Sequence, residues 1–128
     1  DIAKKISFLK SDLLDQFPPP REMNRHAIIT ANLPYLSHRI YDESDHDVRD
    51  YEPKSALESG ADGLDHYRRL LPELAVLRER YQSLTFFLEI SPEQDKVLTA
   101  LIRAHLAPQS LQTLPDYSGR SRLIQGTI

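Results

Sequence analysis

Cysteine is absent from this sequence of 128 residues, which excludes disulfides, metal sites built on thiolates and a cysteine nucleophile. No apolar stretch approaches the roughly 20 residues that a membrane-spanning helix needs. No signal peptide is visible either, so we expect a cytoplasmic protein without a membrane anchor.

A strong excess of charge is absent as well. The formal net charge is −3, so nothing indicates attachment of the whole surface to nucleic acid or to an anionic membrane. Hydrophobic residues make up 40% of the chain and charged residues 27%, as in an ordinary globular protein. At this length we expect one domain at most, with a modest core.

A metal site is not expected. The five histidines are scattered and show no H-x-x-x-H spacing. The acidic stretch at Asp42, Glu43, Asp45 and Asp47 superficially resembles a calcium-binding loop, but it lacks the glycine and the terminal glutamate of such a loop. We interpret it as a solvated acidic segment.

Hydrophobic patterns predict five strands. Lys5–Leu9 alternates apolar and polar residues, and Ala27–Ala31 is a short β-branched run typical of a buried strand. Leu84–Ile90 is almost continuously apolar, which predicts a central strand covered on both faces. Ser110–Leu114 and Arg122–Ile128 are joined by a short turn-rich link, which predicts an antiparallel hairpin.

Two helices are expected between these strands. Apolar residues recur at helical spacing from Leu64 to about Gln82, where Pro72 should kink or divide the helix. Ser91 followed by proline and glutamate predicts the start of the second helix, which ends near Pro108. Residues 36–58 are polar and predict a loop. The sum is an α/β fold with a mostly parallel sheet that ends in an antiparallel hairpin.

The most informative motif is Asn32-Leu33-Pro34-Tyr35, directly after the strand predicted at Ala27–Ala31. Open α/β sheets bind their ligands at the carboxyl ends of their strands. An asparagine side chain offers an acceptor and two donors, proline stiffens the backbone and tyrosine supplies a flat face. Together these predict a grip for a planar nitrogen nucleophile. The alternative is an Asx-type turn that merely closes the strand.

With this motif in place, the chain resembles the bacterial HemK-type peptide chain release factor glutamine methyltransferases from about Lys5 to its C-terminus. An N-x-P-Y motif alone is shared with adenine-N6 and other amino-group methyltransferases. The E-P-x-x-A-L segment closely followed by D-G-L is more specific to protein-glutamine enzymes. The resemblance rests on Asn32–Tyr35, Tyr51–Leu57, Gly60–Arg68, Leu88–Ile90 with Gln94, and Asp116–Arg122.

The resemblance implies methyl transfer from S-adenosylmethionine to the glutamine side-chain amide in the Gly-Gly-Gln motif of peptide chain release factors. Asn32 would accept from the substrate amide and orient it, and it would also border the cofactor. The carbonyl of Leu33 would take the second amide hydrogen, and Pro34 and Tyr35 would complete the grip. The family usually has proline where Leu33 stands; the carbonyl survives the change, while the turn loses rigidity.

Three carboxylates around this motif have two interpretations each. By resemblance, Asp12 faces the adenine of the cofactor; otherwise it is a helix cap or a solvated loop residue. Glu52 either shapes the mouth of the substrate site or belongs to an acidic surface. Glu89, at the end of the central strand, is either a buried and paired carboxylate or one that faces water.

Folds of this class carry a glycine-rich turn after the first strand and an acidic residue at the end of the second. The four glycines, at positions 60, 63, 119 and 126, form no G-x-G cluster. The whole chain, residues 1–128, therefore resembles the C-terminal part of a catalytic domain, without the family's N-terminal substrate domain, and we expect it to be inactive alone. Two alternatives remain: an adenine-N6 nucleic-acid methyltransferase, which should bring a basic groove, and a non-catalytic binding module of the same fold.

A sheet shortened in this way would expose an apolar edge. We expect Lys5–Leu9 to lack its native strand neighbour and Ala27–Ala31 to lose one as well. Either the N-terminal segment rearranges to cover Ala27–Ala31, or the chain associates with itself through that edge.

Overall fold

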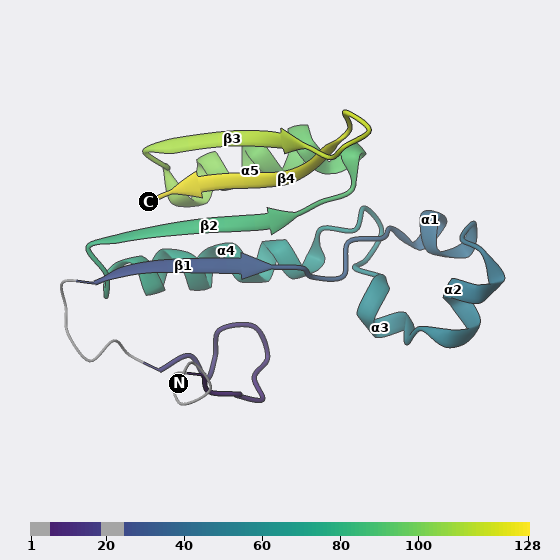
Figure 1. Cartoon of the computed structure of the whole chain (residues 1–128), viewed down its shortest axis with the longest axis horizontal. Helices are drawn as coiled ribbons and strands as arrows, with labels where there is room; N and C mark the ends of the chain where they lie inside the picture. Colours follow the sequence, from purple (N-terminus) through teal and green to yellow (C-terminus); the bar gives the residue numbers. More distant parts are fainter. Residues whose placement is uncertain (1–5, 19–24) are drawn as a thin grey trace.

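The computed structural model describes residues 6–18 and 25–128 (Figure 1). A short 3-10 helix, η2 (Pro92–Gln94), directly precedes the last α-helix. The strands are β1 (His26–Ala31), β2 (Ser83–Glu89), β3 (Ser110–Pro115) and β4 (Ser121–Thr127). The α-helices are α1 (His38–Asp42), α2 (His46–Tyr51), α3 (Lys54–Leu57), α4 (Asp65–Arg78) and α5 (Asp95–Leu106).

The four described strands form one sheet in the order β1-β2-β4-β3. β1 pairs with β2 in parallel, whereas β4 is antiparallel to both β2 and β3. The predicted α/β class, the central strand at Leu84–Ile90 and the C-terminal hairpin are thus confirmed. The prediction of a mostly parallel sheet is wrong: the sheet is mixed, because the hairpin places its second strand directly beside β2.

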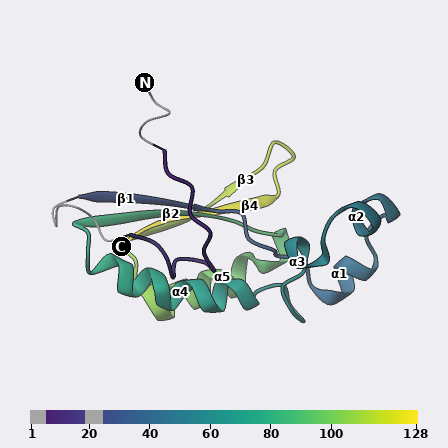
Figure 2. The same ribbon diagram turned by 90° about the horizontal axis from the view of Figure 1, so that it is seen from below.

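One face of the sheet carries the core. Figure 2 shows α4 and α5 side by side on the same face. The β2 residues that point to these helices, Leu84, Phe86 and Leu88, have no exposed surface, while those between them are only half-buried. The predicted coverage of Leu84–Ile90 on both faces is therefore wrong for the described residues. Its almost continuous apolarity includes Phe87, which lies on the open face.

α4 packs its apolar stripe on the sheet. Tyr67, Leu70, Leu71, Leu74 and Leu77 recur at helical spacing and are all buried. Pro72 lies on the exposed side within one helix of 14 residues, so the alternative in which it divides the helix is wrong. No helix within residues 6–18 and 25–128 is long and apolar enough to cross a membrane.

The strand predicted at Lys5–Leu9 is wrong where it can be judged; residue 5 lies outside the described residues. Ile6–Leu9 has no regular structure and is exposed. Instead, the following residues contact α4: Asp12 forms an ion pair with Arg69 at 2.6 Å, and the Leu14 amide donates to Glu73 at 2.8 Å. Alternation alone does not make a strand, since a strand needs a neighbour to complete its hydrogen bonds.

The loop predicted at residues 36–58 contains three short helices, α1 to α3, so that prediction is wrong. Each helix is stabilised locally; at α1, for example, the Ser37 hydroxyl accepts from the Ile40 amide at 3.3 Å. None of the three has a buried residue. Short helices without an apolar stripe leave no periodic signal in the sequence.

Candidate functional site

A cavity of about 310 Å³ lies at the carboxyl end of β1. Asn32–Leu36 forms one wall, and Glu52, Ala56 and Leu57 form the other. Five residues predicted for the substrate site, Asn32–Tyr35 and Glu52, therefore border the same space. Their side chains come from two segments separated by α1 and α2.

The two walls are joined by backbone hydrogen bonds. The Leu36 amide donates to the Leu57 carbonyl at 2.8 Å, and the Ser59 amide donates to the Leu36 carbonyl at 2.9 Å. The His38 amide adds a bond to the Gly60 carbonyl at 3.1 Å. Residues 38–57 therefore form an excursion whose two ends meet beside the tetrapeptide.

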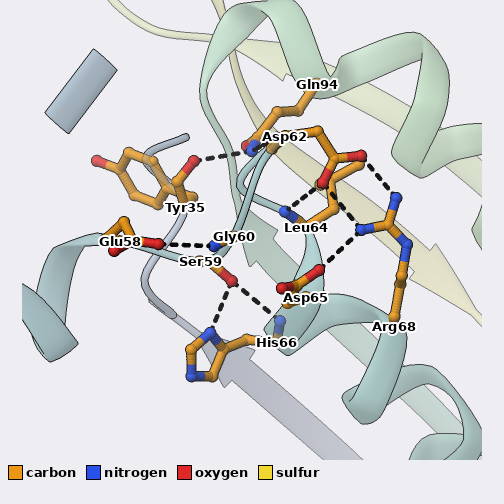
Figure 3. Close-up of polar contacts among 10 residues, drawn as sticks. All are labelled: Tyr35, Glu58, Ser59, Gly60, Asp62, Leu64, Asp65, His66, Arg68 and Gln94. Atoms are coloured by element: carbon orange, nitrogen blue, oxygen red, sulfur yellow. Dashed lines mark hydrogen bonds and ion pairs between the residues drawn. The ribbon is translucent and has the colours of Figure 1, made fainter. Parts of the chain in front are cut away.

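The side chain of Gln94 lies beside the backbone carbonyl of Tyr35 and is buried, with 3% of its surface exposed (Figure 3). Its Nε2 donates to the Tyr35 carbonyl at 2.8 Å and to the Asp62 carbonyl at 3.1 Å. Its Oε1 accepts from the Ser91 amide at 3.0 Å. One side chain thus connects the turn after β1, the turn before α4 and the turn after β2.

The turn before α4 is shaped to let this happen. Gly63 has φ +75°, and a Cβ there would lie 2.1 Å from the Tyr35 carbonyl oxygen and 2.4 Å from Gln94 Nε2. Arg68 holds the same turn with two hydrogen bonds to the Asp62 carboxylate, at 2.6 and 2.8 Å. The Arg68 guanidinium keeps the pKa of Asp62 below its usual range.

A buried hydroxyl stabilises the start of α4. Ser59 is 2% exposed, and its Oγ accepts from the His66 amide at 3.0 Å. The same oxygen lies 2.6 Å from His66 Nδ1 (Figure 3). A hydroxyl acceptor at the first turn satisfies an amide that has no carbonyl partner within the helix. This pair therefore fixes the turn relative to α4.

The tyrosine of the tetrapeptide points to the end of β2. Its hydroxyl donates to Glu89 Oε1 at 3.3 Å. Burial and then the nearby Glu89 charge raise the pKa of Tyr35 above its ordinary value. The hydroxyl of Tyr67 donates to the backbone carbonyl of Glu89. Of the two interpretations of Glu89, a buried and paired carboxylate or one that faces water, the structure shows a paired carboxylate that is only half-buried.

Asn32 is exposed and borders two cavities. Besides the one lined by Leu33–Leu36, it lines a second space of about 460 Å³ with Thr30, Phe87, Glu89 and others on the open face of the sheet. Its amide is therefore accessible from more than one direction.

Asp12, predicted to face the cofactor, is not brought to this cavity. Its carboxylate is engaged by Arg69 on α4, and the N-terminal segment follows that helix. Within the described residues, no group of three or more histidine, cysteine, aspartate or glutamate side chains is placed to hold a metal ion. The chemistry that remains at the tetrapeptide is that of fixed hydrogen-bond acceptors and a flat aromatic face.

Sequence reasoning missed the role of Gln94, which entered only as part of the resemblance. The S-x-x-Q spacing from Ser91 to Gln94 is a capping-box pattern and predicts that the Gln94 side chain turns back to the Ser91 amide. That signal was sufficient to place one of its three bonds. The other two join residues 59 and 32 positions away and leave no local trace.

Comparison with known proteins adds an independent line of evidence. No protein-family model matches the chain. The chain is 39% identical to the release factor glutamine methyltransferase of Moorella thermoacetica, over 94% of this chain and 40% of the relative. The same name is carried by relatives from Caulobacter vibrioides, 35% identical over 77% of this chain and 33% of the relative, and from Rhodopirellula baltica, 30% identical over 96% and 40%.

The match covers most of this chain but a minor part of each relative. The chain spans about two fifths of the length of the Moorella and Rhodopirellula proteins, and it corresponds to their C-terminal part. Sequence, tetrapeptide and the segments around it point the same way: the chain belongs to the release factor glutamine methyltransferase family.

Proposed function

We propose that the cavity at Asn32–Tyr35 receives a glutamine side-chain amide for methylation, with S-adenosylmethionine as the methyl donor and the Gly-Gly-Gln motif of peptide chain release factors as the substrate. The observation that carries the proposal is the gathering of Asn32–Tyr35 and Glu52 around one cavity at the carboxyl end of β1. The names of the relatives support the same reaction and the same substrate class.

The residues of the cavity suit an amide nucleophile. An amide nitrogen is a weak nucleophile because its lone pair is delocalised, and it carries two N–H groups. The Asn32 side-chain oxygen and the Leu33 carbonyl would accept one N–H each, and the Tyr35 ring would lie on the amide plane. Fixed acceptors supply orientation and electrostatic stabilisation without a strong base.

When bound, S-adenosylmethionine supplies a methyl group on a sulfonium, so that a nitrogen–carbon bond forms as the sulfur–carbon bond breaks and the nitrogen loses one proton. The part of this chain is to hold the nitrogen in line and to stabilise the positive charge that builds on it. The half-buried Glu89 carboxylate, one hydrogen bond behind Tyr35, contributes negative charge close to that point.

The described residues fit a site for the methyl acceptor better than a site for the methyl donor. Asn32 is accessible for contact with a methyl donor. Gly60 and Gly63 shape the turn before α4, Gly119 lies in the hairpin turn and Gly126 faces Phe86, so none forms a cofactor cradle. We therefore propose that residues 1–128 are the C-terminal part of a catalytic domain. The glycine-rich strand and the N-terminal substrate domain then correspond to the regions of the relatives that this chain does not match.

A chimera tests the proposal. The 121 matched residues of this chain replace their counterparts in the Moorella relative, and the chimera receives methyl-labelled S-adenosylmethionine with a release factor or with adenine-containing DNA. We expect label on the glutamine of the Gly-Gly-Gln motif and none on DNA. Label on adenine would support the nucleic-acid alternative, and binding without transfer to either acceptor would support the non-catalytic module.

Two further expectations accompany this function. We propose a cytoplasmic location, where release factors act.

We also propose that β1, which has no strand on its outer side among the described residues, associates with a second copy when the chain is isolated. Sedimentation at several concentrations tests the second point; a monomer at all of them would contradict it.

A further inference from the structure

We infer that Gln94 is a positioning residue of the acceptor site, which fixes the turn that presents Asn32 and Leu33. The inference rests on the proposed function for its chemical meaning, but the geometry can be tested without it. Gln94 does not line the cavity, and its side chain reaches the tetrapeptide through a hydrogen bond to the backbone carbonyl of Tyr35.

The tetrapeptide is anchored at two points. Ala31, just before it, is in register with Leu88 in the parallel β1–β2 ladder. Tyr35, at its end, is anchored by the bond from Gln94 to its carbonyl oxygen. Only three residues, Asn32 to Pro34, lie between these anchors, and the proline ring fixes one of their φ angles. Without the Gln94 bond, this end would keep only the bonds of Leu36 to Leu57 and Ser59 and the bond of the Tyr35 hydroxyl to Glu89. The peptide units that aim both substrate acceptors would then be less tightly held.

A glutamine is required at this position by its pattern of donors and acceptors. Both Nε2 hydrogens are used by carbonyls, of Tyr35 and Asp62, and Oε1 accepts from the Ser91 amide. A carboxylate in the same place would turn an oxygen toward two carbonyl oxygens. An apolar side chain of equal length would leave the buried Ser91 amide and the part-buried carbonyls of Tyr35 and Asp62 without these bonds. A residue larger than glycine does not fit at position 63, because its Cβ would collide with both Tyr35 and Gln94.

The first test uses NMR spectra of the full chain carrying Gln94→Met, which keeps the length of the side chain and removes its hydrogen bonds. We expect the amide signals of Asn32, Leu33 and Tyr35 to shift or broaden, while the methyl signals of Leu84 and Leu88 in the core stay in place. The matched control is Gln112→Met. Gln112 also donates through its side-chain amide, to Gln125 at 3.0 Å, but it is exposed on β3.

A second variant adds a pH readout that a purely space-filling role would not produce. In Gln94→Glu, the neutral carboxyl can donate to the Tyr35 carbonyl, whereas the charged form cannot. Burial raises the pKa of a carboxyl above its ordinary value of about 4.3. The Asn32–Tyr35 signals should therefore be native-like in acid and should move as the pH rises through that pKa. Wild type measured over the same range is the reference.

Three results would overturn the inference: unchanged Asn32–Tyr35 signals in Gln94→Met, core signals that move as much as those of the turn, or a Gln94→Glu spectrum without pH dependence at the turn. In the chimera, Gln94→Met should lower kcat about tenfold and leave KM for the release factor nearly unchanged. If the unsubstituted chimera transfers no methyl group while the NMR result holds, the proposed function fails and the positioning role stands.

Discussion

Two segments border the candidate site, and they are stabilised in opposite ways. The base, formed by Ser59–Leu64 and Gln94, contains fully buried side chains and hydrogen bonds to three different turns. The rim, formed by helices α1, α2 and α3, has no buried residue, and its ion pairs include exposed ones such as Arg39–Glu43 at 2.9 Å. The residues that we propose to orient the substrate amide are thus held by the stable base, while the mouth of the cavity is formed by the weakly stabilised rim.

This division suits a macromolecular substrate. Hydrogen-bond acceptors that must align with a reacting nitrogen work best when they are fixed before the substrate binds, because a misalignment of about 1 Å lowers the reaction rate strongly. A rim with few buried contacts opens locally at low free energy and can adjust to an incoming protein segment. Glu52, between α2 and α3, belongs to the rim yet lines the cavity, so adjustments of the rim would reach the substrate proposed to bind there.

The largest expected effect is on kcat and comes from substitution of Asn32 in the tetrapeptide. In the chimera, Asn32→Ala should lower kcat by about 10²–10³, the scale for loss of one fixed hydrogen-bonding group in a transition state. Binding of S-adenosylmethionine, measured by calorimetry, should change little. Asn32→Asp keeps an oxygen acceptor and should retain more activity than the alanine variant. An alanine variant as active as the parent would refute the assigned role.

The next effect tests the base directly through its glycine. Gly63→Ala combines a positive φ, which costs about 1–2 kcal/mol for a residue with a Cβ, with a collision against the Tyr35 carbonyl that adds about 1–3 kcal/mol. Gly119→Ala is the matched control, because Gly119 has φ +81° and nothing within 4 Å of the new Cβ. Urea unfolding of both variants separates the two terms. Equal losses would mean that the close approach at Gly63 is unimportant.

A smaller effect concerns acid. The Arg68 guanidinium lowers the pKa of Asp62, so the folded state favours the charged carboxylate more than the unfolded chain does. The resulting stabilisation is complete above the unfolded pKa, about 3.9, and disappears as the pH falls through the lower folded value. Unfolding curves recorded at neutral and at acid pH should therefore show a smaller acid loss for Asp62→Asn than for wild type. If Asp62→Asn lost as much free energy of unfolding in acid as wild type does, the Arg68–Asp62 pair would not stabilise the fold as proposed.

The smallest effect is expected on the rim. Arg39→Ala removes an exposed i,i+4 ion pair with Glu43 and should change the free energy of unfolding by less than about 0.5 kcal/mol. Double substitution of Arg39 and Glu43 gives the pair energy. A loss comparable to that of Gly63→Ala would show that the rim is as strongly coupled to the fold as the base.

The difference between base and rim also explains which features the sequence predicts. β2, α4 and the hairpin follow from apolar periodicity and turn residues, signals that are local. The gathering of Glu52 with Asn32 came only from the resemblance, since no periodic pattern links residues 20 positions apart. The sheet is mixed and not mostly parallel because Ile6–Leu9 adds no parallel strand and both pairings of β4 are antiparallel.

Other features escaped prediction for related physical reasons. The short helices of the rim bury no side chain, so they have no stripe to detect. Ile6–Leu9 carries a strand pattern without a described neighbour to complete it. Gln94 is a polar residue at a buried position, and its contacts depend on two distant backbone carbonyls. Only Ser91, three residues away, is within the range of a sequence rule.

Native-state hydrogen exchange along the full chain tests the contrast most directly, because it reports the free energy of opening for each amide. We expect the amides of Leu36, Ser59 and Ser91, which are bonded within or beside the base, to exchange nearly as slowly as those of β2. Amides within α1 and α2 should exchange much faster. If the amides of Leu36 and Ser59 exchanged as fast as those of α2, the claim that the base holds the site rigid would be contradicted.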